Sequence, residues 1–432
     1  MASLRERLSE NEKKNGLIKV GLVGAGQMGA GLMSQMEKMD GMAVVAVADV
    51  LPGRAKEAYG EAGVDSDLVH EVDDLAKAAE LITDGQRVVS TSGDFMAQIK
   101  NLDVVVEATG IPEIGAQICY SAIQRKKHVV NMNVEADATI GYLLGQKAKE
   151  AGVVYSLAAG DEPGSIKEIF DFADALGFEI VTIGKGKNNY LDRTSNPETA
   201  AADAKKQNMS PKMLASFRDG TKTMVEMTSI GNATGFAPEV RGAHGPECSV
   251  KDLPKVFVPK ADGGIFEGKG AVDYAVGDVA PGVFVVITTD QPKIIADLNY
   301  LRLLGHGNYW ALYRPYHLAN LETPITVANV ALYQQETLVT MRKPVAETIT
   351  VAKRDLIAGE RVDGLGGFTV YGIIEKASLA HDEELLPLGL AVGATLIKDV
   401  PMGKALRYSD VDLKEDQLIV KLRREQDAMI KS

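Results

Sequence analysis

Short apolar runs alternate with helical segments over the N-terminal part of the chain, and this alternation predicts a parallel sheet. The predicted strands are, in order, KVGLV, AVVAVAD, RVVSTS, DVVVEATG, HVVNMN and VVYSLAAG. The segments between them have the composition and period of helices, which supply the crossovers of a doubly wound sheet with helices on both faces. The sequence therefore predicts an α/β domain of Rossmann type over residues 1–160.

The pattern changes after residue 160. A predicted helix, SIKEIFDFADALG, leads to a predicted strand, FEIVTIGKGKNN, and later to a region dense in glycine and proline from 231 to 270. We interpret 161–304 as an inserted α+β substrate domain, after which the chain completes the first domain over about 305–340. Short β-rich runs between glycine turns then predict a small all-β domain over 341–432.

The turn after the first predicted strand carries three glycines. Gly24 allows the tight turn, Gly26 allows backbone to approach a pyrophosphate, and Gly29 allows the next helix to pack closely on its strand. The motif also requires a carboxylate at the end of the next strand, and Asp49 lies there. The sequence therefore predicts a dinucleotide site that includes Gln27 and Met28. A βα turn that binds no nucleotide is the alternative.

Two residues bear on which coenzyme binds. Asp49 ends the second predicted strand, where a carboxylate accepts hydrogen bonds from the ribose of NAD. Arg54 lies five residues later, where it can pair with the 2′-phosphate of NADP or remain a solvated surface residue. The sequence thus predicts NADH or NADPH. Further coenzyme contacts are expected where later strands end, at Thr109, Gly110, Asn131 and Asn133.

Composition and charge exclude several classes of protein. The 432 residues are 45% hydrophobic and 25% charged, as in soluble proteins of two or three domains. The net charge of −12 argues against nucleic-acid or anionic-membrane partners, so we expect a small-molecule substrate. Two cysteines, no signal peptide and no apolar run long enough for a bilayer predict a cytoplasmic protein.

Several charged residues are candidates for chemistry. Asp161 and Glu162 lie at the first domain junction, where they either cap a helix or bind a metal or substrate hydroxyls. Lys185 and Lys187 alternate along a predicted strand, which aims both ammonium groups to one side as an anion clamp, with Asn188 beside them.

The segment DGTKTMVEM is a second candidate. If it is helical, Asp219, Lys222 and Glu226 fall three and four residues apart and share one face. A surface ladder of ion pairs is the alternative, but the small and apolar residues that follow predict a buried helix. A lysine desolvated in such a place exchanges protons near neutral pH and suits a role in hydride transfer.

Two further clusters join a histidine to an arginine. YRPYHL contains Tyr313, Arg314 and His317, and we expect the arginine to bind an anionic group while the histidine titrates near neutral pH. RGAHGPE contains Arg241 and His244, which we interpret in the same way. Packing or surface roles are the alternative for both clusters.

These motifs together resemble a known family. GLVGAGQMG is common to many dehydrogenases, whereas GKGKNN, DGTK and YRPYHL in this order resemble homoserine-dehydrogenase-like oxidoreductases that carry a C-terminal SAF domain. KRDLIAGE and DVPMGKALRYSDVDL are similar to the SAF module itself. Within this group the chain resembles the reductoisomerase-like (DRL) enzymes, which convert 1-deoxy-D-xylulose 5-phosphate to 2-C-methyl-D-erythritol 4-phosphate with NADPH.

The resemblance implies particular roles for residues of this chain. Homoserine dehydrogenases place a catalytic lysine beside carboxylates on a helix of the substrate domain, and Lys222 is the matching residue. Because the metal motif of ordinary reductoisomerases is not recognisable, Mg²⁺ or Mn²⁺ would use Asp161, Glu162 and Glu226. Dimers are common in the dehydrogenase group, so a homodimer is expected.

Two other functions remain open on the sequence. A homoserine-type or sugar alcohol dehydrogenase would transfer hydride without rearranging the carbon skeleton. A nucleotide-sensing protein would instead use the SAF-like module to bind a partner and carry out no reaction.

Overall fold

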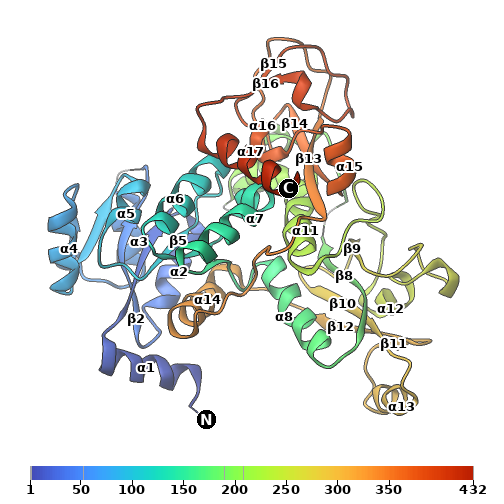
Figure 1. The fold of residues 1–432 in the computed structure, drawn as a ribbon, viewed down its shortest axis with the longest axis horizontal. Helices are drawn as coiled ribbons and strands as arrows, with labels where there is room; N and C mark the ends of the chain where they lie inside the picture. The colour runs from blue at the N-terminus through green and yellow to red at the C-terminus, as the bar shows by residue number, and fades with distance from the viewer. Residues whose placement is uncertain (1, 52, 189, 208, 432) are drawn as a thin grey trace. The chain divides into compact units, whose positions relative to one another are not determined.

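The computed structural model describes residues 2–51, 53–188, 190–207 and 209–431, and the chain forms two compact units (Figure 1). Unit 1 comprises Met1–Asp161, Leu318–Met341 and Glu425–Met429. Unit 2 comprises Glu162–His317, Arg342–Arg424 and Ile430–Ser432. Most of the segment expected as a separate C-terminal domain therefore groups with the substrate segment.

Unit 1 contains a seven-stranded parallel sheet in the order β3-β4-β2-β1-β5-β6-β7. This confirms the predicted doubly wound α/β sheet. Its strands are β1 Ile18–Val23, β2 Met42–Ala48, β3 Val69–Glu71, β4 Arg87–Ser90, β5 Val104–Glu107, β6 His128–Asn131 and β7 Tyr155–Leu157. Only β3 was not predicted, because three residues of mixed polarity are too short to give a periodic signal.

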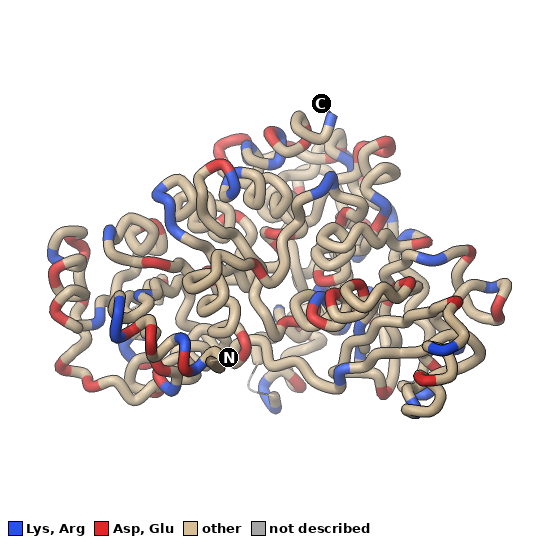
Figure 2. The backbone as a smooth tube through the Cα atoms, turned by 60° about the horizontal axis from the view of Figure 1, so that its bottom comes forward, with Lys and Arg blue, Asp and Glu red and all other residues tan. Residues whose placement is uncertain are grey.

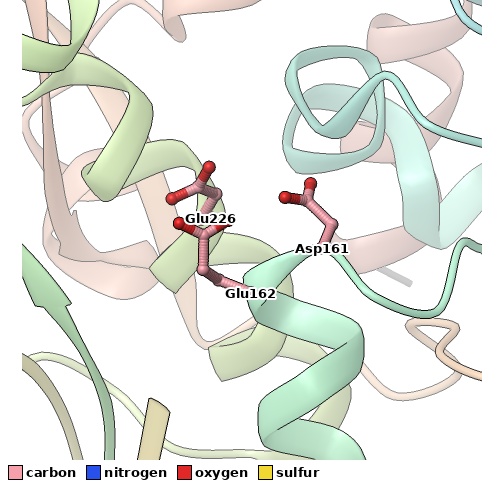
Figure 3. A group of neighbouring side chains, drawn as sticks. All are labelled: Asp161, Glu162 and Glu226. Atoms are coloured by element: carbon pink, nitrogen blue, oxygen red, sulfur yellow. The ribbon is translucent and has the colours of Figure 1, made fainter. Parts of the chain in front are cut away.

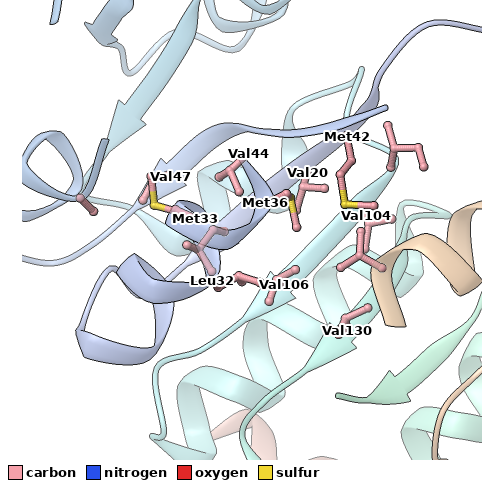
Figure 4. Packing of buried hydrophobic residues seen from close by; sticks show 14 of the residues in the cluster. Val20, Leu32, Met33, Met36, Met42, Val44, Val47, Val104, Val106 and Val130 are labelled. Atoms are coloured by element: carbon pink, nitrogen blue, oxygen red, sulfur yellow. The ribbon is translucent and has the colours of Figure 1, made fainter. Parts of the chain in front are cut away.

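The helices of unit 1 cover this sheet. They are α1 Leu4–Asn15, α2 Gln27–Met36, α3 Arg54–Glu61, α4 Leu75–Thr83, α5 Gly93–Gln98, α6 Pro112–Gln124, α7 Val134–Ala151 and α14 Ala319–Tyr333. Figure 4 shows Leu32, Met33 and Met36 of α2 among valines from the central strands. All three are fully buried, and burial of each stabilises the fold by about 1.5–3 kcal/mol. This packing fixes the start of α2 over the carboxyl ends of the strands.

Unit 2 contains a five-stranded mixed sheet in the order β11-β12-β10-β8-β9. Its strands are β8 Glu179–Lys187, β9 Ala271–Val276, β10 Val283–Thr288, β11 Gly305–His306 and β12 Tyr309–Arg314. Only the β8–β9 pair is parallel. The expected return to the first domain at about 305 therefore begins later, at Leu318, because β11 and β12 pair within unit 2.

Helices and two small strand pairs complete unit 2. The helices are α8 Glu162–Ala175, α9 Pro197–Lys206, α10 Pro211–Arg218, α11 Thr221–Thr234, α12 Leu253–Val256, α13 Pro292–Tyr300, α15 Ala377–Asp382 and α16 Leu388–Ala391. The antiparallel pairs are β13 Ala346–Ala352 with β14 Val370–Lys376, and β15 Thr395–Leu396 with β16 Val411–Asp412. The last helix, α17 Leu418–Lys431, includes residues of both units.

The central helix of unit 2 is α11, which packs on α8, β13 and β14. Eleven of its residues are buried, as the small and apolar sequence predicted. Basic and acidic residues are interspersed along the whole backbone (Figure 2), and no described helix is both long and apolar enough to cross a membrane.

Candidate active site

Three glycines shape the turn between β1 and α2. Gly24 has a φ of +99°, and a Cβ there would lie 2.7 Å from the carbonyl oxygen of Ala108. A Cβ at Gly29 would lie 2.0 Å from the carbonyl oxygen of Gly24, so the helix approaches the turn only without a side chain. A Cβ at Gly26 would meet no atom within 4 Å. The turn therefore leaves space for a pyrophosphate where a dinucleotide site requires it.

The first turn of α2 is suited to an anion. Gly26 is the N-cap residue, and no described side chain caps the helix. The next two residues, Gln27 and Met28, are exposed. The unpaired N–H groups and the positive end of the helix dipole thus remain available to a phosphate.

Asp49 and Arg54 flank the end of β2. The carboxylate of Asp49 accepts hydrogen bonds from the N–H groups of Ala25 and Leu51, each at 2.9 Å, and so ties the strand end to the glycine turn. Each carboxylate oxygen keeps a lone pair for a ribose hydroxyl. Arg54 begins α3 and is exposed. The two groups that recognise a 2′-hydroxyl and a 2′-phosphate are therefore both present.

A buried carboxylate holds the turn after β5. Glu107 is fully buried, and its Oε1 accepts a hydrogen bond from the N–H of Thr109 at 2.8 Å. Burial raises the pKa of Glu107 to about 7. Thr109 is half-buried, and the exposed Gly110 adopts a φ of +68°. Glu107 thus positions Thr109, which the sequence assigned to the coenzyme, although no motif pointed to Glu107 itself.

Asn131 and Asn133 have partners within the fold. Asn131 is fully buried and donates to Tyr155 Oη at 2.9 Å and to the carbonyl of Asn133 at 3.1 Å. Asn133 is also fully buried, caps α7 through the N–H of Ala136 and donates to the carbonyl of Ile111. The structure thus gives both residues, which the sequence assigned to the coenzyme, architectural partners.

Lys185 is the centre of a charged cluster in unit 2. It lies on β8 with 5% of its surface exposed and donates to Glu162 Oε1 at 2.5 Å and to Glu226 Oε2. Burial alone would lower the pKa of Lys185, but the two carboxylates outweigh it and raise this pKa above its ordinary value. Residues from β8, α8 and α11 therefore meet at one point.

Two further groups extend this cluster. Lys222 Nζ lies 3.7 Å from Glu226 Oε1, one turn along α11. His317 Nε2 lies 3.6 Å from Glu162 Oε1, and its Nδ1 lies 2.8 Å from the carbonyl oxygen of Pro281, which makes Nδ1 the protonated nitrogen. Burial and the adjacent Glu162 raise the pKa of Glu226 in spite of the two lysines. The cluster therefore contains carboxylates and ammonium groups that can exchange a proton.

The expected metal ligands also lie here. The carboxylates of Asp161, Glu162 and Glu226 each offer an oxygen within 4.8 Å of the others. Figure 3 shows the three side chains, with Asp161 and Glu162 adjacent in the chain and Glu226 on α11. Hard oxygen ligands of this kind suit Mg²⁺ or Mn²⁺. Two of the three already bind the ammonium group of Lys185, so a cation would have to share them with a lysine.

Asp219 does not join this cluster as the helical pattern predicted. It precedes α11 because Gly220, in the left-handed conformation, separates α10 from α11. Its fully buried carboxylate accepts from Lys353 Nζ at 2.8 Å and from the N–H of Thr221 at 2.8 Å. Burial raises the pKa of Asp219 in spite of Lys353. Asp219 thus anchors the start of the helix that carries Lys222.

Lys187 follows Lys185 on the same face of β8. It is 4% exposed, and its Nζ donates to the carbonyl oxygen of Phe217 at 2.7 Å. Burial, followed by the nearby ammonium of Lys185, lowers the pKa of Lys187 to about 8. Asn188 comes next and is exposed. These residues therefore lie beside the Lys185 cluster, as the strand spacing predicted.

The other predicted substrate residues have partners of their own. Arg314 donates to Ser165 Oγ at 3.1 Å and to Glu168 Oε2 at 2.8 Å. Tyr313 donates to the carbonyl of Val279 at 3.0 Å. Arg241 pairs with Glu375 of β14 and with Glu383 at 2.7 Å. These contacts tie the elements of unit 2 together and leave only His317 of the YRPYHL motif at the cluster.

Sequence reasoning missed two cationic residues. Lys353 directly follows the apolar strand β13 and is buried, and its place at the end of an apolar run was the one available sequence signal. Arg193 donates to the carbonyl oxygen of Asp219 at 2.5 Å and lies 4.8 Å from the centre of the Tyr371 ring. No motif marked Arg193, because its neighbours approach it only in the folded chain.

Comparisons with known proteins agree with this division of the chain. Residues 160–323 match the family model described as oxidoreductase DRL, catalytic domain. Residues 24–158 match the model described as homoserine dehydrogenase, NAD binding domain. The first segment lies largely in unit 2 and the second in unit 1. A comparison with curated proteins gave no match.

Solved structures of dehydrogenases match the chain at low identity. A probable dehydrogenase from Thermotoga maritima is 14% identical, with a TM-score of 0.41 over 72% of this chain and 88% of that one. A scyllo-inositol dehydrogenase from Lactobacillus casei, solved with NAD(H) and scyllo-inositol, is 17% identical, with a TM-score of 0.38 over 68% and 76%. The two family models together show an NAD(P)-dependent oxidoreductase, with a segment similar to the DRL catalytic domain and one similar to the NAD-binding domain of homoserine dehydrogenase.

Proposed function

We propose that the enzyme interconverts a small phosphorylated or acidic polyol and its carbonyl form, with 1-deoxy-D-xylulose 5-phosphate as the substrate. The carbon skeleton of this ketose rearranges to a branched aldehyde, which takes hydride to give 2-C-methyl-D-erythritol 4-phosphate. The observation that carries this proposal is the cluster of Lys185, Glu162, Glu226 and Lys222, which lies inside the segment matched by the DRL catalytic domain. The resemblance of GKGKNN and DGTK to reductoisomerase-like enzymes supports the same substrate.

Lys222 is the proposed proton donor. It contacts Glu226, and burial together with the adjacent Glu162 raises the pKa of this carboxyl, which favours its protonated form. As a carbonyl carbon accepts hydride, Lys222 protonates the oxygen, and Glu226 restores the proton to the lysine. Lys185 holds Glu226 and Glu162 in place, and His317 lies beside Glu162. Lys222 and Glu226 therefore transfer the proton, whereas Lys185 positions the carboxylates.

A nicotinamide coenzyme held by the glycine turn would supply the hydride. The N–H groups of α2 would bind its pyrophosphate, and Asp49 would accept from its ribose. Arg54, exposed at the start of α3, would add affinity for a 2′-phosphate. We therefore propose that both NADH and NADPH bind and that Arg54→Ala selectively weakens NADPH.

A dehydrogenase that leaves the carbon skeleton unchanged is the second candidate, and Lys185 favours it. The rearrangement would use a divalent cation, and Asp161, Glu162 and Glu226 are the residues that would hold it. The ammonium of Lys185 already compensates two of these carboxylates. Homoserine-type or sugar alcohol dehydrogenation needs no such cation. A partner-binding SAF-like module in 341–432 and a homodimer remain proposals for either function.

Coenzyme oxidation with 1-deoxy-D-xylulose 5-phosphate tests the first candidate. We expect turnover and a branched product by NMR, and Lys222→Met should lower kcat by about 10²–10⁴-fold. Lys251→Met, which removes an exposed lysine of unit 2, is the matched control and should be unaffected. An unbranched product would select the second candidate, and no turnover with either coenzyme would reject the substrate.

A further inference from the structure

Lys187 is buried without a carboxylate to balance it. Among the described residues its ammonium group donates to one backbone carbonyl, that of Phe217, and makes no ion pair. The nearest acids are committed elsewhere, because Asp219 binds Lys353 and Glu226 binds Lys185. A buried charge in this state is costly to the fold unless a ligand completes it.

Arg193 brings a second cation to the same turn. Its guanidinium donates to the carbonyl oxygen of Asp219, two residues beyond the carbonyl that Lys187 binds. Among the described residues Arg193 also makes no ion pair, and it stacks on the ring of Tyr371. Arg193 is partly exposed, so solvent and ligands can reach the Lys187 and Arg193 pair from the side of Arg193. The C-terminal end of α10 therefore collects two cations, neither of which makes an ion pair among the described residues.

We propose that Lys187 and Arg193 form a phosphate-binding subsite in unit 2, which takes the phosphate monoester of the substrate. A planar guanidinium and an ammonium group suit a dianion, because both form charge-assisted hydrogen bonds to its oxygens. Arg314, which the sequence favoured for this task, is instead paired with Glu168. The subsite adds a binding site for the phosphate to the proposed function. The identity of the substrate rests on that proposed function.

The two lysines of β8 then have separate tasks. Lys185, balanced by Glu162 and Glu226, belongs to the end of the site where protons move. Lys187, directed to the same face two residues later, belongs to the end that binds charge. A substrate with a carbonyl at one end and a phosphate at the other fits this order.

Calorimetric titration with inorganic phosphate tests the subsite without any turnover. Saturating NAD is included so that phosphate cannot occupy the glycine turn. We expect Lys187→Met and Arg193→Met each to weaken phosphate binding by 10-fold or more, and Lys251→Met to leave it unchanged. Equal binding by wild type and both variants overturns the proposal, as does acetate binding as tightly as phosphate, or phosphate binding that NAD abolishes.

The stability of Lys187→Met separates a ligand site from a structural cap. The pKa of Lys187 is lowered from 10.5 to about 8 in the folded protein, so the unfolded chain binds more protons between these values. Wild-type stability should therefore rise with pH through this window relative to the variant. At pH 7 the variant should melt at a higher temperature. A lower melting temperature at pH 7 would identify Lys187 as a cap for α10 and overturn the proposal.

Discussion

Two pairs of buried polar residues end strands in the two units, and their partners differ. Asn131 ends β6 in unit 1 and Asn133 follows it, and both are 0% exposed. Lys185 and Lys187 lie at the end of β8 in unit 2 and are 4–5% exposed. The asparagines bond to backbone groups and to Tyr155. Lys185 has two carboxylates, whereas Lys187 has one carbonyl. Burial alone therefore does not distinguish a structural residue from a functional one. The hydrogen-bond and ion-pair partners of each residue do distinguish them.

The largest loss of stability should come from removing Lys185, the lysine that is paired with two carboxylates. Lys185→Met leaves the carboxylates of Glu162 and Glu226 close together and without their shared cation. Breaking a buried pair in this way costs about 3–5 kcal/mol of the free energy of unfolding. Urea denaturation measures the loss, with Lys251→Met as the control.

A second variant keeps this test decisive. In Lys185→Met/Glu226→Gln, one of the two unpaired carboxylates becomes neutral, so part of the lost stability should return. If Lys185→Met is as stable as the wild type, Lys185 contributes no net stabilisation, and the contrast between Lys185 and Lys187 fails.

Two glycine variants sharpen the comparison within unit 1. Gly29→Ala places a methyl group against the carbonyl oxygen of Gly24 and should cost about 1–3 kcal/mol of stability. Gly26→Ala meets open space, so the free protein should keep its stability while coenzyme binding weakens by about 10-fold, or 1.4 kcal/mol. Thermal unfolding and coenzyme titration of both variants measure these effects. A stable Gly29→Ala that binds coenzyme normally would contradict the proposed turn.

The sequence predicted unit 1 better than unit 2 for a physical reason. Parallel strands buried on both faces give continuous apolar runs, and the glycine turn is local, so both are visible in short windows. In unit 2 the decisive contacts are distant in sequence. Asp219 meets Lys353 across 134 residues, and only the fold reveals this pair. The local signal at Asp219 was the following Gly220, which ends one helix before the next begins.

The same reasoning explains the mixed result for the candidate site. Spacing along β8 and α11 correctly grouped Lys185 with Lys187 and Lys222 with Glu226, because both periods are local. Arg314 and Arg241 looked equally suitable by residue type. Their carboxylate partners lie on other elements, and no local sequence pattern predicts such partners.

The smallest loss of stability should come from replacing an asparagine of the buried pair in unit 1. Asn133→Ala removes the cap of α7 and the bond to the carbonyl of Ile111, which should cost about 1 kcal/mol of stability. Asn133→Ser keeps a capping oxygen and should lose less. Because Asn133 is fully buried and bonds within the fold, NADH and NADPH affinities should stay within about twofold of wild type, as titration of both variants would show. Weaker coenzyme binding at unchanged stability would instead make Asn133 a ligand and remove the distinction between the two buried pairs.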